Sequence, residues 1–250
     1  MKEYCIVIPA YNEADKITST LTKVTSYMNT FSVSYEVLVV DDGSSDGTAE
    51  KVEEYARSNE NVNLVKNQHK GKGVAVWTGV MRSDSQYIYL CDADLSTPIS
   101  EIKKLSIWAK EHDFDIVIAS REGPNAQRLN EPLYRHLMGR VFNTIVQIVA
   151  TPGIKDTQCG FKLLKSGAAK KIFSKLKIYN PQAETLSNPY MGAFDVEVLY
   201  LARKMGFKIK EVSVIWKYVK TNRLSPMRDA GRMVRDVLQI RVNDLKGKYI

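Results

Sequence analysis

The chain has 250 residues, of which 44% are hydrophobic and 26% are charged, and its formal net charge is +8. These values fit a globular α/β protein and exclude an intrinsically disordered chain, and no repeat of about 20–50 residues indicates a solenoid. The three cysteines are odd in number and far apart in the sequence, so we expect reduced thiols and a reducing compartment rather than a disulfide framework.

Short runs rich in β-branched residues alternate with longer helical patterns in the first half of the chain. They predict buried strands at residues 4–8, 35–40, 62–66, 87–91 and 115–119. Strands that alternate with helices in this way predict a mainly parallel sheet with helices on both faces. Ligands of such sheets bind beyond the carboxyl ends of the strands, so we expect the chemistry in the loops that follow them.

The pattern changes after Arg121, where a polar segment leads through Pro132 into a helix expected at 133–150. We expect this helix to lie over the first unit as an extension of it. No linker separates independent domains, so one domain is expected over residues 1–250. The remaining predicted elements are a loop at 151–160, a segment at 161–164, a helix from about Asp195, a strand near 209–216 and a basic amphipathic helix near 227–242.

Acidic residues follow two of the predicted strands. Asp92 and Asp94 come directly after one strand, and their carboxylates are the hard ligands that Mg²⁺ and Mn²⁺ prefer. A divalent ion there would neutralise the charge of a departing diphosphate. Asp41 and Asp42 end another strand, before a serine- and glycine-rich turn that also suits a helix cap. Asp42 is well placed to accept hydrogen bonds from a base or a ribose.

The segment from His69 to Gly73 reads His-Lys-Gly-Lys-Gly. It lacks the spacing of a P-loop, which disfavours an ATPase or a GTPase. Its glycines permit close approach of the backbone to a ligand, and Lys72 supplies positive charge for a nucleotide. His69 is expected to be structural or to lie beside the nucleotide rather than to act as a catalytic base.

Taken together, these motifs resemble the inverting family 2 glycosyltransferases of GT-A fold. The residues that carry the resemblance are VIPAYNE at 7–13, VVDDGSSDGT at 39–48, GKG at 71–73 and DAD at 92–94. Further motifs resemble the dolichyl-phosphate glucosyltransferase and mannosyltransferase branch, with more likeness to the glucosyltransferases. They are DLSTP at 94–98, ASREG at 119–123, DTQCGFK at 156–162 and FDVE at 194–197.

The resemblance implies a nucleotide-sugar half at 1–120 and an acceptor half at 121–250 with the amphipathic helix at its end. Glucose from UDP-glucose is the expected donor sugar, and GDP-mannose is the alternative. Mg²⁺ or Mn²⁺ is implied at Asp92 and Asp94, and Ser96 stands where the mannosyltransferases have a further metal-binding Gln. The residues implied in donor binding are Pro9, Tyr11, Glu13, Asp42 and Lys72.

The implied acceptor is a dolichyl or polyprenyl phosphate, gripped by Arg121 and Arg135. Gln158, Lys162, Arg128 and Arg140 are expected to line the sugar and acceptor side or to assist. A lipid phosphate is already an anionic nucleophile, so no general base is needed and positioning and charge stabilisation dominate. Asp195 and Glu197 remain possible bases, but a structural or sugar-orienting role is favoured.

Two other functions compete with this interpretation. A sugar nucleotidyltransferase usually has a glycine- and arginine-rich loop after its first strand, whereas this chain has Pro9 to Glu13 there. A nucleic-acid-binding module would account for a basic tail, but the acidic loops would oppose phosphate binding. We therefore expect no nucleic acid as a partner, and the sequence does not indicate an oligomeric state.

The basic charge is concentrated in residues 216–250, which hold nine Lys and Arg and three Asp. Only three residues precede the first apolar run, so we expect no secretion signal, a cytoplasmic protein and peripheral contact with an anionic membrane. The alternative to membrane contact is that the helix near 227–242 packs its apolar stripe on the protein core. The stripe consists of Met227, Ala230, Val234, Val237 and Leu238, and Arg228, Arg232 and Arg235 lie off it. We also expect Val141, Ile145 and Ile148 to enter the membrane interface. They belong to an apolar segment that is too short to span a bilayer.

Overall fold

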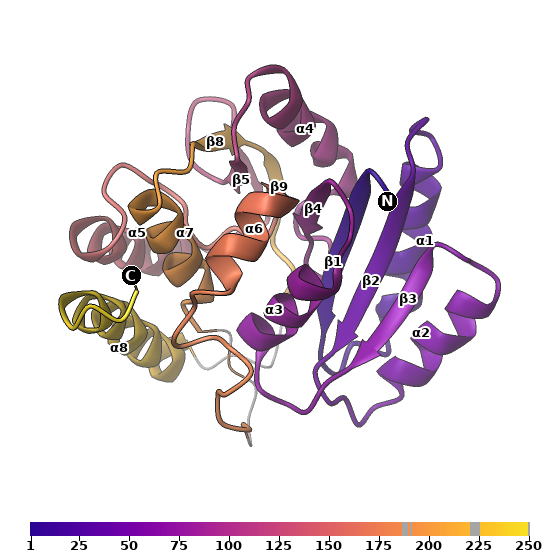
Figure 1. Ribbon diagram of the computed structural model, residues 1–250, viewed down its shortest axis with the longest axis horizontal. Helices are drawn as coiled ribbons and strands as arrows, with labels where there is room; N and C mark the ends of the chain where they lie inside the picture. Colours follow the sequence, from indigo (N-terminus) through magenta and orange to yellow (C-terminus); the bar gives the residue numbers. More distant parts are fainter. Residues whose placement is uncertain (187–189, 191, 221–225, 250) are drawn as a thin grey trace.

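The structure is a computed structural model that describes residues 1–186, 190, 192–220 and 226–249 (Figure 1). Its described part contains a seven-stranded sheet in the order β3-β2-β1-β4-β7-β5-β8. Only β7 runs antiparallel to its neighbours, so the predicted mainly parallel α/β sheet is confirmed. The strands are β1 (Tyr4–Ala10), β2 (Tyr35–Asp41), β3 (Val62–Lys66), β4 (Tyr87–Leu90), β5 (Ile116–Ser120), β7 (Lys162–Lys165) and β8 (Ile209–Ser213).

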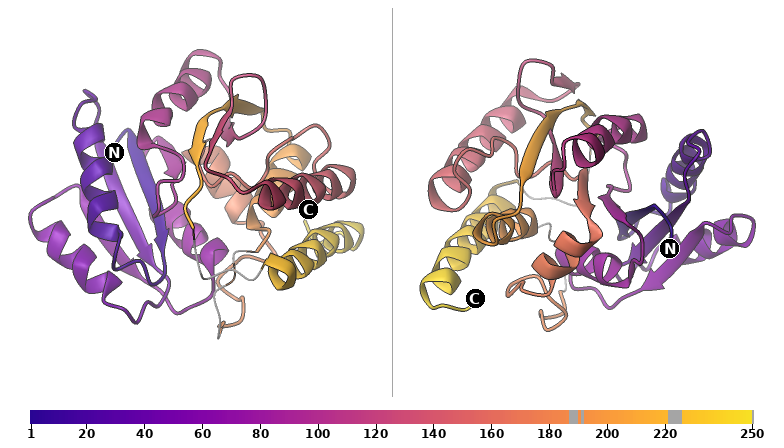
Figure 2. Two further views of the ribbon diagram at one scale, coloured as in Figure 1. Left: turned by 180° about the vertical axis from the view of Figure 1, so that it is seen from behind. Right: turned by 45° about the horizontal axis from the view of Figure 1, so that its top comes forward.

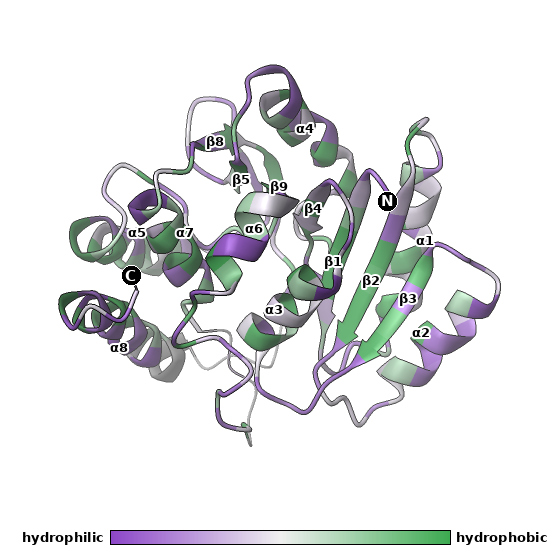
Figure 3. Ribbon diagram, in the orientation of Figure 1, coloured by the Kyte–Doolittle hydropathy of each residue, from purple (hydrophilic) through white to green (hydrophobic). Residues whose placement is uncertain are grey.

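Helices cover both faces of this sheet, as the two views of Figure 2 show. Because side chains alternate between the faces of a strand, Cys5 and Val7 of β1 pack on one helical layer, whereas Ile6 and Ile8 pack on the other. The strands β1 to β3 are accordingly hydrophobic over most of their length (Figure 3). One layer holds α1 (Ile17–Met28), α2 (Thr48–Arg57) and α4 (Ile102–Glu111), and the other holds α3 (Lys72–Arg82), α6 (Ser166–Phe173) and α7 (Phe194–Lys204).

The single strand expected near 209–216 is wrong, because the chain forms two strands there. β8 joins the main sheet, and β9 (Ile215–Lys217) pairs in parallel with β6 (Gln127–Leu129) in a small second sheet. Val214 links them: its amide donates to Ser120 and its carbonyl accepts from Gln127. No Gly, Pro or Asn separates the two strands in the sequence, so the sequence does not reveal that the partner changes. The helix α6 also lies outside the predicted elements.

Two helices, α5 (Leu133–Val149) and α8 (Pro226–Leu245), lie side by side at the end of the molecule remote from β3 (Figure 1). In α8, Val237 and Ile240 are fully buried, so part of the predicted apolar stripe packs on the core, whereas Leu238 is 51% exposed. Met227 and Arg228 of the predicted helix face fall outside the side chains that the structure describes. Among the described residues, no helix is both long enough and apolar enough to cross a bilayer.

Candidate active site

The two acids after β4 are close together at the carboxyl edge of the sheet. Asp94 accepts hydrogen bonds on Oδ1 from both the amide (2.9 Å) and the hydroxyl (2.7 Å) of Ser96. Ser96 thus orients the Asp94 carboxylate, and its hydroxyl is turned towards that carboxylate. Burial, together with the negative charge of Asp92, raises the pKa of Asp94. A cation between the two carboxylates would relieve this repulsion.

The carboxylate of Asp92 occupies space that only a glycine leaves open. A Cβ atom built on Gly160 would lie 2.1 Å from Asp92 Oδ2, although Gly160 is not at a positive φ. A glycine just before β7 would also suit a turn that enters a strand. The structure gives a different reason, which is that the segment before β7 passes directly against the Asp92 carboxylate.

A lysine supplies the ion pair of Asp92. The Nζ atom of Lys72, the first residue of α3, lies 2.5 Å from Asp92 Oδ1. Burial opposes the charge of this ammonium, but Asp92 and Asp195 outweigh it and raise the pKa of Lys72. Lys72 therefore remains a cation at neutral pH and neutralises one of the two strand-end acids.

The loops after β2 and β3 are joined through Asp42, which is only 2% exposed. Its carboxylate accepts hydrogen bonds from the amides of Lys70 (3.0 Å) and Gly71 (2.8 Å) and lies 2.8 Å from Nδ1 of His69. Burial raises the pKa of Asp42, and these hydrogen bonds offset part of the rise. The His69 ring stacks on Tyr11 at 4.0 Å between centroids. Asp42 thus fixes His69, which in turn contacts the tyrosine of the first loop.

The first loop is itself bonded to the second. The amide of Asn12 donates to the Ser44 hydroxyl (2.9 Å), and the amide of Glu13 donates to the Thr48 hydroxyl (2.8 Å). Pro9, in the last part of β1, is half-buried beside them. The turn residues of the second loop therefore do more than cap α2, because they also position the residues expected to bind the donor.

Two further carboxylates near this edge are buried. Asp195 Oδ1 lies 2.5 Å from Nζ of Lys162, which also donates to the carbonyl of Cys159, and both charged side chains are at most 5% exposed. Glu197 is fully buried and accepts hydrogen bonds from the amides of Lys177 (2.7 Å) and Ile178 (3.1 Å). These bonds support the structural role favoured for Glu197, and Asp195 serves as the counter-ion of Lys162.

The acceptor side begins with Arg121, just after β5. Its guanidinium binds the buried Asp156 in a two-point arrangement, with Nε and Nη2 each 2.8 Å from a carboxylate oxygen. Burial opposes the ionisation of Asp156, but Arg121 outweighs it and lowers the pKa of Asp156 to about 2. The other side of the guanidinium lies over the Trp216 ring at 5.2 Å.

The other three predicted arginines surround the start of α5. Arg128 binds both Glu122 (2.5 Å) and Glu131 (2.7 Å), and Arg140 reaches Glu122 at 3.0 Å. Arg135 instead lies over the Tyr218 ring at 5.0 Å, and no carboxylate of the described residues lies within ion-pair distance of it. Of these side chains, Arg135 has the charge that the protein neutralises least.

The acidic and arginine groups lie on two sides of the segment that contains Gly160. Leu90 of β4 and Ile118 of β5 both pair with Lys162, so Asp92 and Arg121 follow neighbouring positions in the sheet. Gln158 lies in the same segment, and its buried Nε2 atom has no hydrogen-bond partner among the described residues. The sequence missed three relationships here, namely the pairing of Arg121 with Asp156, the pairing of Lys72 with Asp92 and the closeness of Gly160 to Asp92.

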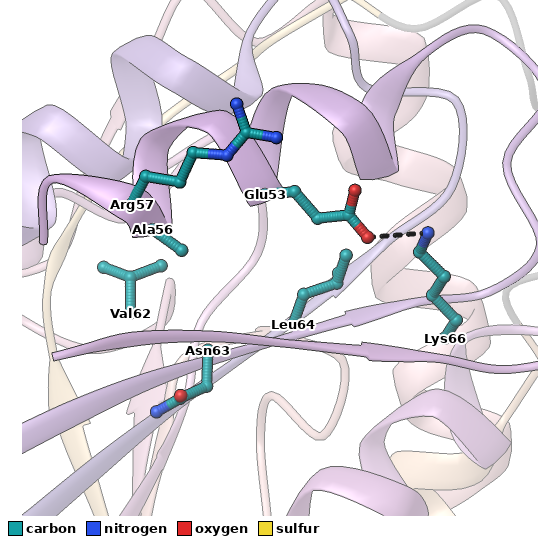
Figure 4. A pocket seen from close by; sticks show the side chains of 7 residues that line it. All are labelled: Glu53, Ala56, Arg57, Val62, Asn63, Leu64 and Lys66. Carbon is teal, nitrogen blue, oxygen red and sulfur yellow. Dashed lines mark ion pairs between the residues drawn. The ribbon is translucent and has the colours of Figure 1, made fainter. Parts of the chain in front are cut away.

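A shallow pocket lies elsewhere, between α2 and the edge strand β3 (Figure 4). It is lined by an ion pair between Lys66 and Glu53 (2.8 Å) and by neighbouring apolar side chains. None of the predicted site residues lines it. In the described part of the chain, no group of three or more His, Cys, Asp and Glu side chains could hold a metal ion. Asp92 and Asp94 would therefore share a cation with ligands supplied by substrate or water.

Comparison with known proteins adds a family match. Residues 5–173 match the family model for glycosyl transferase family 2. Over 255 residues the chain is 34% identical to the dolichyl-phosphate beta-glucosyltransferase of Dictyostelium discoideum, and the match covers 97% of this chain and 75% of that protein.

Solved structures share the fold at low identity. Mannosyl-3-phosphoglycerate synthase from Rubrobacter xylanophilus is 17% identical with a TM-score of 0.67, and the match covers 99% of this chain and 75% of that one. Glucosyl-3-phosphoglycerate synthase from Mycobacterium tuberculosis, in complex with Mn²⁺, UDP-glucose and phosphoglyceric acid, is 17% identical with a TM-score of 0.62. That match covers 97% of this chain and 79% of that one. The fold expected from the resemblance is thus confirmed.

Proposed function

The chain belongs to glycosyl transferase family 2 and is a glycosyltransferase, and we propose that it transfers glucose from UDP-glucose to a dolichyl or polyprenyl phosphate with inversion at the anomeric carbon. The observation that carries the proposal is the pair of charge clusters beside residues 158–162. Acids suited to a metal and a diphosphate lie on one side, and arginines suited to a phosphate lie on the other. The name of the Dictyostelium relative supports the choice of sugar and lipid.

The donor binds, in this proposal, over the loops after β1, β2 and β3. Tyr11 presents a ring that can stack on a base, and Asp42 holds His69 against it. Pro9 and Glu13 complete this wall. The donor pyrophosphate then lies towards Lys72 and the two acids after β4. The structural neighbour from Mycobacterium tuberculosis was solved with Mn²⁺ and UDP-glucose, which supports a donor of this kind.

A divalent ion, Mg²⁺ or Mn²⁺, fits the chemistry of Asp92 and Asp94, because the two acids repel each other and offer hard oxygen ligands. Such an ion supplies charge neutralisation for the leaving diphosphate. Ser96 would act on it through Asp94, whose carboxylate its hydroxyl orients at 2.7 Å. The Ser96 oxygen keeps its lone pairs while its hydrogen is donated to Asp94, so the same hydroxyl could also bind the ion directly.

The acceptor phosphate meets the arginine side. Arg135 carries a charge that no described carboxylate neutralises, so it is the arginine best prepared to bind phosphate directly. Arg121, Arg128 and Arg140 add positive potential while they keep the carboxylate partners that position them. The lipid phosphate itself attacks the anomeric carbon, so Asp195 need not accept a proton and can remain paired with Lys162.

Peripheral contact with the cytoplasmic face of a membrane completes the proposal, because the acceptor is a lipid. The helix α5 begins beside the arginine cluster, and its Leu133, Leu137 and Val141 are 82%, 64% and 56% exposed. An exposed apolar stripe with basic residues beside it fits a helix that lies in a lipid interface. The apolar side chains would enter the interface while Arg140 faces anionic headgroups.

A donor panel tests the proposed function. The protein is incubated with UDP-glucose, UDP-galactose or GDP-mannose and a short polyprenyl phosphate, in Mg²⁺, in Mn²⁺ or in excess EDTA. We expect a glucose-linked lipid that depends on UDP-glucose and on the metal, and we expect no product from the Asp94→Ala variant. Product from GDP-mannose alone would favour the alternative donor, and product from UDP-glucose in EDTA would refute the metal requirement.

A further inference from the structure

Lys72 lies where a charged group of the donor complex would also have to lie. Its Nζ atom is 2.5 Å from Asp92 Oδ1, and its side chain is only 17% exposed. Asp94 and Asp195 also act on its charge. In this structure, therefore, a cation belonging to the protein itself already occupies the strand-end acid that the proposed function gives to a metal.

The carboxylates around Lys72 differ in the counter-ions and hydrogen-bond donors that they have. Asp195 has its own counter-ion, Lys162, at 2.5 Å. Asp94 has one oxygen occupied by the amide and hydroxyl of Ser96. Among the described residues, Asp92 has only Lys72 as an ion-pair partner. Loss of the Lys72 ammonium would therefore leave Asp92, rather than its neighbours, without compensation.

The backbone of Lys72 is fixed by its two neighbouring glycines. The preceding Gly71 adopts a φ of +90° and donates its amide to Asp42 at 2.8 Å. The following Gly73 is packed so tightly that a Cβ atom there would lie 2.7 Å from the Tyr179 ring and 2.9 Å from Phe194. The four-carbon side chain can thus change partner without movement of the start of α3.

We propose that Lys72 is a positioning residue that exchanges partners, binding Asp92 in the free enzyme and the donor diphosphate in the loaded enzyme. The inference rests on the proposed donor site and deepens it. A divalent ion and the Lys72 ammonium would both draw on the negative charge of the Asp92 carboxylate, so Lys72 weakens the binding of a divalent ion alone. A nucleotide diphosphate accepts the displaced ammonium, so Lys72 makes the nucleotide and the ion bind cooperatively. The reactive acids are thereby kept neutralised until a donor arrives.

Isothermal titration calorimetry of Mn²⁺ alone, of UDP alone and of UDP with Mn²⁺ tests this role without any transfer reaction. We expect Lys72→Met to bind Mn²⁺ alone at least about tenfold more tightly and UDP with Mn²⁺ at least about tenfold more weakly than the wild type, a tenfold change being 1.4 kcal/mol. Lys72→Arg keeps the charge and should retain the cooperativity. Lys72→Gln provides the same comparison if Lys72→Met does not fold.

The matched control is Lys70→Met. Lys70 belongs to the same loop, but its ammonium donates to the carbonyl of Pro181 (2.6 Å) rather than to a carboxylate, so its loss should leave Mn²⁺ affinity unchanged. Unchanged or weaker Mn²⁺ binding by a folded Lys72→Met variant would overturn the exchange. If the donor base is guanine, UDP will fail and GDP will bind in the wild type. The same titrations with GDP then show whether the donor nucleotide or the role of Lys72 was assigned wrongly.

Discussion

Gly160 and Asp92 lie so close that a Cβ atom on the glycine would stand 2.1 Å from a carboxylate oxygen and 2.5 Å from its carbon. A side chain at position 160 and the present position of Asp92 are therefore incompatible. Because φ at Gly160 is not positive, backbone conformation does not demand glycine there. The absence of a side chain at position 160 leaves room for the Asp92 carboxylate.

The variant Gly160→Ala should displace Asp92 while the fold survives. We expect kcat to fall by about 10²-fold, since a displacement of about 1 Å in a catalytic group can have that effect. Initial rates with saturating donor and circular dichroism measure the two properties. Gly167→Ala in α6 is the control, because no atom lies within 4 Å of its added methyl group. Equal activities of the two variants would show that Asp92 tolerates displacement.

The arginines differ in how they should respond to substitution. Arg135→Ala removes a cation that has no carboxylate partner in the described residues, so we expect a KM for polyprenyl phosphate raised about tenfold or more and a nearly unchanged Tm. Arg121→Ala strands the buried Asp156 and should also lower stability, by about 3–5 kcal/mol. Steady-state kinetics and urea unfolding separate the two effects. An unchanged lipid KM in Arg135→Ala would remove it from the acceptor site.

The Arg121–Asp156 pair should also make stability depend on pH. The pKa of Asp156 is about 2 in the folded chain, against an ordinary value of 3.8, so the pair stabilises the fold fully above about pH 4 and loses its contribution as pH falls towards 2. Urea unfolding of the wild type and Asp156→Asn should differ most near pH 6. The difference should shrink as the pH is lowered from 4 towards 2. A constant difference would show that the charge of Asp156 is not what stabilises the pair.

Glu197 should prove structural in a test that separates folding from catalysis. Its carboxylate accepts hydrogen bonds from backbone amides and from the Tyr249 hydroxyl (2.8 Å), and an amide group could not accept all of them. We expect Glu197→Gln to lower the free energy of unfolding by about 1–3 kcal/mol. The kcat of the folded variant should remain near that of the wild type. The control for loss of a carboxylate is Glu54→Gln, because Glu54 is an exposed residue of α2. A loss of kcat without a loss of stability in Glu197→Gln would instead indicate that Glu197 is a general base.

The sequence was sufficient for the fold of the first half of the chain because each strand there is a short apolar run bounded by turn residues. It failed near 209–216 because β8 and β9 belong to different sheets although no Gly, Pro or Asn separates them in the sequence. The residue types of the site could be recognised, since acids and arginines follow several predicted strands at the edge where ligands of a parallel sheet bind. Their partners could not, because Lys72 and Asp92 are brought together only by the packing of α3 on the sheet.

The sequence indicated membrane contact mainly through the last helix. The exposed apolar side chains of the structure indicate α5 instead as the main candidate for that contact. Val237 of α8 is fully buried, whereas Ile148 of α5 is 78% exposed, and the exposed apolar residues of α5 continue to its first turn. Among the arginines of α8, Arg232 and Arg235 are exposed and remain available for anionic headgroups. In the proposed membrane contact, α5 supplies most of the exposed apolar surface, and Arg232 and Arg235 of α8 add to the positive charge, so the two contributions can be tested separately.

Substitution of α5 should remove the apolar part of that attraction. We expect the double variant Leu137→Glu, Val141→Glu to lose most of its co-sedimentation with vesicles that contain anionic lipid, at low and at high salt. Arg232→Glu with Arg235→Glu should weaken binding mainly at low salt, because each basic residue near such a surface contributes about 1 kcal/mol that salt screens. Ile107→Glu on α4, where the isoleucine is 39% exposed, is the matched control. If the α5 variant sediments like the wild type and the Ile107 variant, α5 does not enter the interface.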